Sequence, residues 1–174
     1  MLSLQATSHE MIRLKAAELR SRMWCVAALS GAVGAIPIPG FSIVFDGSLL
    51  MNEARFYYAQ LGLDEASLKR YAKLTSTDYQ QLQSIVDNSC SWKLSEGQGL
   101  KNMVQLLSSY ASAAALEEGS RFIPVIGCFI ASQLSFGGTY YALKCVLDNT
   151  ESAALKVVKF GAKCAADAEE SDDD

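Results

Sequence analysis

The sequence lacks the residue patterns from which most nucleotide and metal sites are built. A phosphate-binding loop needs glycines followed by Gly-Lys and a hydroxyl residue, and no Gly-Lys pair occurs in the 174 residues. The single histidine, His9, excludes a His-rich metal site, and we expect it to be solvated near the amino end and not a catalytic base. The sequence therefore predicts no catalytic, cofactor-binding or metal-binding residue.

The cysteines are odd in number and widely separated. None of the five stands in a Cys-x-x-Cys pair, the spacing typical of zinc sites and redox motifs. We therefore expect reduced, small apolar side chains in a cytoplasmic protein, and not a disulfide framework. They are Cys25, Cys90, Cys128, Cys145 and Cys164.

A basic stripe is also missing. The net charge is −4, and acidic residues concentrate in 167–174, which we expect to be a disordered tail after a single helical domain spanning 1–166. Without clustered Lys and Arg there is little to neutralise phosphates, so we expect no nucleic-acid partner. The amino end resembles no signal peptide and has no glycine at position 2, so we expect no lipid anchor.

What the sequence does contain is apolar spacing typical of helices. Half of the residues are hydrophobic, and no alternation of the β type persists at useful length. We expect an all-α fold, a multi-helix bundle of about seven helices around two strongly apolar helices. The expected helices span residues 7–35, 41–61, 64–74, 75–87, 100–118, 128–148 and 149–166.

Local signals predict where several of these helices begin and end. Capping residues provide acceptors for the free amides of a first turn, and glycine tolerates the left-handed conformation that ends a helix. The expected starts are Thr7 with Glu10, Asp64, Thr75 with Asp78, and Asn149, and the expected end is Gly62. The pair Gly137-Gly138 predicts a kink or a close helix contact, so the element that contains it is one helix or two.

Each of the two apolar helices is preceded by a proline-glycine corner. Proline lacks an amide donor and clashes with the preceding turn, so it cannot sit inside a helix. We expect rigid corners at Pro37, Pro39 and Gly40, and again at Pro124 and Gly127. A corner with proline and glycine, followed by a nearly charge-free helix, thus occurs twice and forms a weak internal repeat.

Asp46 is the one carboxylate that stands early in a strongly apolar helix. Burying a charge there is costly unless it is hydrogen-bonded. We interpret it as a hydrogen-bond partner of a neighbouring helix end, with a proton-handling role as the alternative.

The two charge-free runs, 23–45 and 122–143, approach the roughly 20 residues that span a bilayer. Both contain Pro and Gly near their middle, which favours buried core helices over spanning ones. The aromatic segment 133–144 is a candidate for core packing or for lying on a membrane surface. The candidate membrane or partner contacts are Leu134, Phe136, Tyr140, Tyr141, Leu143, Lys144 and Leu147.

Several short segments, in this order, match one known family. The first group is Arg22-Met23-Trp24, Ser30-Gly31-Ala32-Val33, Ile36-Pro37-Ile38-Pro39-Gly40, Tyr57, Leu61-Gly62-Leu63-Asp64 and Ser67-Leu68. The second group is Ile123-Pro124-Val125-Ile126-Gly127, Leu134-Ser135-Phe136 and Thr139-Tyr140-Tyr141. Over nearly its whole length the sequence resembles the C-terminal helical region of the immunity-related, interferon-inducible GTPases, which are dynamin-like.

The resemblance implies a non-catalytic helical module that acts in assembly and peripheral membrane association in cell-autonomous innate immunity. It implies as partners a GTPase domain or a second copy, and the surface of an endomembrane or vacuole. GTP and Mg²⁺ are implied only for the full-length family, whose GTP-binding domain this chain lacks, as a fragment or a truncated relative would. The alternative is an integral membrane hairpin or pore-like protein built from the two charge-free helices.

Overall fold

Helices make up nearly all of the chain that the structure describes. The computed structural model describes the backbone of residues 2–36, 41–90 and 126–172, and the side chains of 7–36, 45–90 and 132–167. The helices are α1 (Leu2–Gly34), α2 (Phe41–Gln60), α3 (Glu65–Leu74), α4 (Tyr79–Ser89) and α7 (Ile126–Asp172). Since these segments contain no strand, the all-α class is confirmed, while the total of about seven helices stays a prediction.

The connection from α2 to α3 has the helix end and the helix start that were predicted at Gly62 and Asp64. Gly62 adopts the left-handed conformation at φ 71°, and the Leu63 amide donates back to the Tyr58 carbonyl over 3.0 Å, which satisfies a carbonyl at the helix end. Asp64 then accepts a hydrogen bond from the Ser67 amide at 3.2 Å and caps α3. Both predictions are confirmed.

The start predicted at Thr75 is wrong, because Thr75 ends α3. Its amide donates to the Tyr71 carbonyl, and the N-cap of α4 is Asp78, which accepts from the Gln80 amide at 3.1 Å. The start predicted at Thr7 is also wrong, since α1 already begins at Leu2. Thr7 therefore lies inside a helix.

The predicted break in the last apolar element is also wrong. Helix α7 runs unbroken for 47 residues through Gly137, Gly138 and Asn149, and it continues beyond Ala166 to Asp172. An added Cβ at either glycine would meet nothing within 4 Å, so the pair marks no close helix contact. The cost of about 1 kcal/mol per helical glycine is outweighed by the buried stripe that α7 carries, which includes Thr139, Ala142, Val146, Thr150, Ala153 and Val157.

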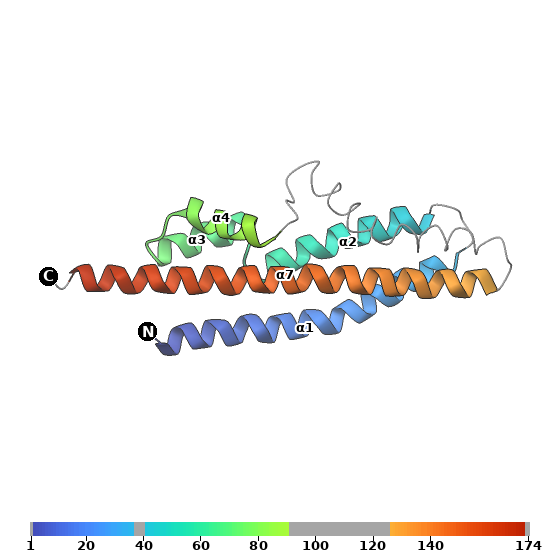
Figure 1. Ribbon diagram of the computed structural model, residues 1–174, viewed down its shortest axis with the longest axis horizontal. Coiled ribbons are helices and arrows are strands. Elements are labelled where there is room, and N and C mark those ends of the chain that lie inside the picture. The colour runs from blue at the N-terminus through green and yellow to red at the C-terminus, as the bar shows by residue number, and fades with distance from the viewer. Residues whose placement is uncertain (1, 37–40, 91–125, 173–174) are drawn as a thin grey trace. The chain divides into compact units, whose positions relative to one another are not determined.

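The chain divides into two compact units. Unit 1 comprises residues 1–18, 56–91 and 147–174, and unit 2 comprises 19–55 and 92–146. In unit 1, α3 and α4 lie along the C-terminal part of α7 (Figure 1), where Tyr71 donates to the Val158 carbonyl at 3.1 Å. Its buried side chains include Tyr57, Leu68, Leu82, Val86 and Val157. The single domain predicted for 1–166 stays a prediction.

Unit 2 joins the second half of α1 to α2 and to the first part of α7. Its buried apolar side chains are Leu19, Met23, Val26, Ala27, Leu50, Ala54, Ala142, Leu143 and Val146. The corner residues Pro37, Pro39, Gly40 and Pro124 lie outside the described residues, as does the expected helix 100–118, and Gly127 lies in the first turn of α7. Among the described residues, no helix is both long and apolar enough to cross a bilayer.

Candidate interaction surface

A polar cluster lies in the core of unit 2, where α1, α2 and α7 meet. Ser30 donates to one oxygen of the Asp46 carboxylate at 2.7 Å, and Ser135 donates to the other at 2.7 Å. Thr139 and Ser30 share a further hydrogen bond of 2.8 Å between their hydroxyls. All four side chains are buried, so the cluster provides hydroxyl partners for a carboxylate that is costly to bury alone.

This arrangement bears on the interpretation of Asp46. The carboxylate accepts hydrogen bonds from side-chain hydroxyls of α1 and α7, so a hydrogen-bonded Asp46 is confirmed, while a contact with a helix end stays a prediction. The sequence does not pair Ser30 or Ser135 with Asp46, because a serine in an apolar run carries no signal of its partner.

The polar cluster coincides with a close approach of α1 and α7. A Cβ added to Gly31 would lie 3.2 Å from the Ser132 carbonyl oxygen and 3.1 Å from the Phe136 Cβ. Gly31 is therefore the position at which α1 has no room for a side chain, and this lets the neighbouring Ser30 hydroxyl reach Ser135 and Thr139.

An aromatic cluster lies on unit 2, formed by Trp24 of α1 and by Phe136 and Tyr140 of α7. The Trp24 ring centroid is 4.6 Å from that of Tyr140 and 5.7 Å from that of Phe136. Trp24 nevertheless stays 55% exposed. The charge-free run 23–45, which we expect to form a buried core helix, therefore carries an exposed ring in its α1 part.

The predicted contact residues of α7 divide into exposed, intermediate and buried positions. Tyr141 and Lys144 are exposed, Leu134, Phe136 and Tyr140 are half-buried, and Leu143 and Leu147 are completely buried. A hydrogen bond with Cys145 raises the pKa of Tyr141. The exposed and half-buried side chains are the ones that a membrane or partner can contact in this conformation. Trp24 belongs with them by its exposure, but it is not among the contact residues predicted from the sequence.

The charges near the aromatic cluster are basic. Arg20 stands four residues before Trp24, and Lys144 stands four residues after Tyr140, so each shares a helix face with its aromatic neighbour. Neither the segment 19–34 of α1 nor the segment 126–147 of α7 contains an acidic residue. Nearby on α1, Arg22 forms a two-point ion pair with Glu53 of α2 at 2.8 and 3.1 Å.

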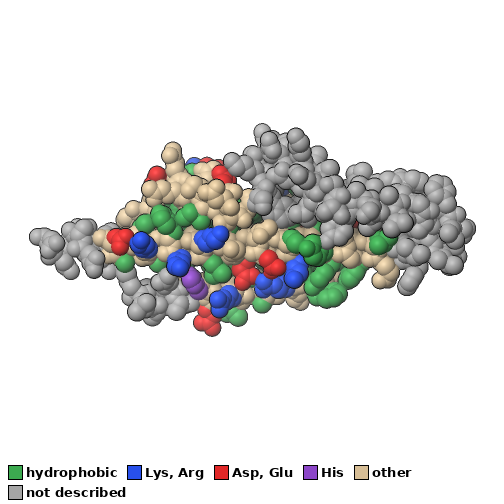
Figure 2. All heavy atoms as spheres, in the orientation of Figure 1, with side chains coloured by type: hydrophobic (Ala, Val, Ile, Leu, Met, Phe, Trp, Pro, Cys, Tyr) green, Lys and Arg blue, Asp and Glu red, His purple; other side chains and the backbone are tan. Residues whose placement is uncertain are grey.

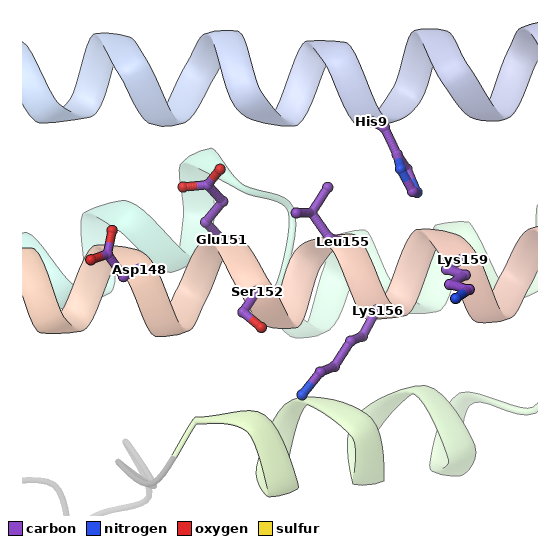
Figure 3. A pocket seen from close by; sticks show the side chains of 7 residues that line it. All are labelled: His9, Asp148, Glu151, Ser152, Leu155, Lys156 and Lys159. Atoms are coloured by element: carbon purple, nitrogen blue, oxygen red, sulfur yellow. The ribbon is translucent and has the colours of Figure 1, made fainter.

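His9 lies beside a hollow in unit 1 and is half-buried, so the expectation that it is solvated is wrong. The hollow has a volume of about 360 Å³, and its other lining residues are Asp148, Glu151, Ser152, Leu155, Lys156 and Lys159 of α7. Figure 3 shows the imidazole reaching from α1 toward α7. Within the described residues its buried Nε2 has no hydrogen-bond partner.

The Cys90 thiol is buried in unit 1. Its Sγ lies 3.8 Å from the Asn149 carbonyl oxygen, and burial raises its pKa. Burial also raises the pKa of the neighbouring Tyr58, with a further contribution from its hydrogen bond to Cys90. Among the described residues, no three His, Cys, Asp or Glu side chains are grouped so that they could hold a metal ion.

Comparison with known proteins finds a family and several curated relatives. A family model described as interferon-inducible GTPase (IIGP) matches residues 1–159. Interferon-inducible GTPase 5 of Rattus norvegicus is 29% identical over 157 residues, which cover 90% of this chain and 34% of that protein. The protein of the same name from Bos taurus is 29% identical over 162 residues, which cover 90% of this chain and 33% of that protein. No solved structure matches, and the chain spans about a third of the length of these relatives.

Proposed function

Because this chain belongs to the interferon-inducible GTPase family, we propose that it is a helical module for assembly and peripheral membrane association, with no catalytic step of its own. Its setting is cell-autonomous innate immunity, at the surface of an endomembrane or vacuole. Its protein partners are a GTPase domain or a second copy of the chain. The names of the relatives describe them as GTPases, and we assign GTP turnover to the part of such a protein that this chain does not span.

The observation that carries the membrane role is the exposed ring of Trp24, which is held against Tyr140 and Phe136. Trp and Tyr are enriched at membrane interfaces because one side of the ring is apolar while the other tolerates water. Stacking within the cluster fixes the rings before binding, so that less side-chain entropy is lost on contact. A fixed aromatic group at a surface supports a contact role.

The basic surroundings support the same surface. Arg20 and Lys144 share helix faces with the aromatic cluster, and both flanking segments are free of acidic residues. Basic residues near a membrane surface each contribute about 1 kcal/mol of attraction to anionic lipids. We therefore propose that this face binds an anionic membrane surface from the cytoplasmic side, with the helices lying against the membrane.

Vesicle flotation of the purified chain tests the proposal. We expect the chain to float with vesicles that contain phosphatidylserine, to float less with neutral vesicles, and to leave the membrane in alkaline carbonate. Retention after carbonate would instead favour the integral hairpin. If the chain neither floats with any vesicle nor associates with itself or with a GTPase domain, the proposal is wrong.

A further inference from the structure

The C-terminal part of α7 carries a basic face that lies in unit 1, apart from the aromatic cluster. Lys156, Lys159 and Lys163 follow one another at three and four residues, so their side chains share one face of the helix. Figure 2 shows Lys and Arg side chains spaced along this part of α7 with hydrophobic side chains beside them. The 15 residues from Ser152 to Ala166 contain these three lysines and no acidic residue.

The three lysines border an apolar groove. It has a volume of about 540 Å³, and its other lining residues are Ile85 of α4 and Phe160, Ala162 and Ala166 of α7. Phe160, Ile85 and Ala162 are half-buried, so they line the groove with accessible carbon atoms. Among the described residues that line this groove there is no carboxylate, and a ligand in it would meet hydrocarbon on its floor and ammonium groups along its rim.

The ammonium groups are partly held in place and partly available. Lys156 donates to the Ser89 hydroxyl at the end of α4 over 3.2 Å, which holds it at the border between the two helices. In the described part of the chain, Lys159 and Lys163 have no hydrogen-bond or ion-pair partner. Glu151 and Asp167 lie just outside the acid-free segment.

The groove and the neighbouring hollow beside His9 differ in the charge of the residues that line them. Lys156 and Lys159 line both cavities, but the hollow beside His9 also contains Asp148 and Glu151. Their carboxylates oppose a negatively charged ligand, whereas the charged residues among the described lining of the groove are all lysines. Charge complementarity therefore selects the groove.

We infer that this groove is a binding site for an anionic amphiphile, such as a fatty acid or a lipid monoester. Its apolar chain would lie against Ile85, Phe160 and Ala162, and its acidic group would lie between Lys159 and Lys163. Burial of the chain supplies affinity in proportion to the apolar area covered, and the paired ammonium groups select a negative head group. This site is independent of the aromatic cluster.

Isothermal titration of the full chain with dodecyl phosphate, at concentrations where the probe is monomeric, tests the inference. We expect saturable binding, with inorganic phosphate and dodecyltrimethylammonium each at least about ten-fold weaker. Equal binding of the cationic and anionic probes would refute the site. So would an absence of any saturable binding of dodecyl phosphate.

Two variants locate the binding in the groove. Lys159→Gln with Lys163→Gln removes the head-group contacts, and Ala162→Gln fills the apolar floor with a residue that favours helices. Each is expected to weaken dodecyl phosphate binding by at least about ten-fold. Arg70→Gln with Lys73→Gln is the matched control, since it removes two exposed cations from α3 of the same unit. Equal losses in the control and the groove variants would contradict the assignment.

Discussion

Ser30 donates a hydrogen bond of 2.7 Å to the buried carboxylate of Asp46, and this contact ties α1 to α2. Ser135 completes the arrangement from α7 by donating to the other carboxylate oxygen. Three helices of unit 2 therefore depend on one buried acidic group. A buried carboxylate that loses a donor keeps its desolvation cost, so the cluster is sensitive to single substitutions.

Ser30→Ala is expected to destabilise the chain by about 1–3 kcal/mol, because the Asp46 carboxylate loses a donor and Thr139 loses its partner. Urea unfolding monitored by circular dichroism measures the change. Ser21→Ala is the matched control, since Ser21 is an exposed serine of the same helix, and we expect a change within about 0.5 kcal/mol. Equal effects of the two substitutions would show that the polar cluster contributes nothing.

The ion pair between Arg22 and Glu53 is asymmetric, because the Arg22 side chain is 50% exposed and that of Glu53 is 7% exposed. Arg22→Gln leaves a nearly buried carboxylate without its cation, so we expect a loss of about 1–2 kcal/mol, reduced from the value for a fully buried pair by solvent screening. The measurement is a double-mutant cycle with Glu53→Gln in urea. Additive effects of the two substitutions would contradict a direct coupling.

The N-cap of α3, Asp64, predicts that the stability of the chain depends on pH. The hydrogen bond from Ser67 holds the pKa of Asp64 below its ordinary value, so between the two pKa values the unfolded chain binds more protons than the folded chain. The stabilisation is therefore present above about pH 4 and is lost as the pH falls through the folded-state pKa.

Comparison with Asp64→Asn isolates this effect, because asparagine also caps helices but carries no charge. Wild type is expected to be more stable than the variant by about 0.3–1 kcal/mol at pH 6 and low ionic strength, and the difference should shrink below pH 4. Urea unfolding across this range measures it. Asp167→Asn, in an exposed part of α7, is the control, and a difference for Asp64 that grows on acidification would reverse the predicted sign.

Burial of Cys90 predicts slow modification. A thiol whose pKa is raised by burial forms less thiolate at a given pH, and the thiolate is the reactive species. Cys25 is exposed. Under native conditions we expect iodoacetamide to label Cys25 at least about ten-fold faster than Cys90, as followed by peptide mass spectrometry. Similar rates that persist well below the denaturation midpoint would show that Cys90 is not protected.

The helices and several of their ends could be predicted from the sequence because the signals that set them are local. Gly62 and Asp64 act within one turn of their own position, and the structure places them as expected. The boundary predicted at Asn149 and the two-helix alternative at Gly137-Gly138 failed because the buried stripe of α7 overrides local preference. A glycine costs about 1 kcal/mol in a helix, and packing along 47 residues can offset that cost.

The candidate surface was less accessible to sequence reasoning, because it depends on which residues of α1 and α7 meet. Tyr140 and Phe136 belonged to an aromatic segment that the sequence marked as unusual, whereas Trp24 stood alone in a run of small apolar residues. Only the structure brings its ring to 4.6 Å from Tyr140. The same limit applies to Ser30 and Asp46, whose contact joins two helices.

Vesicle flotation of two matched double variants tests the proposed membrane surface most directly. Trp24→Ser with Tyr141→Ser removes two exposed aromatic side chains from the described part of unit 2, Trp24 of the aromatic cluster and Tyr141 next to its member Tyr140. Met11→Ser with Leu74→Ser removes two apolar side chains of unit 1 that are more exposed still. With vesicles containing phosphatidylserine, we expect the first variant to lose at least about ten-fold in partitioning and the second to float like wild type. Flotation of the first variant at the wild-type level, with both variants folded by circular dichroism, would contradict the assignment of membrane binding to the aromatic cluster.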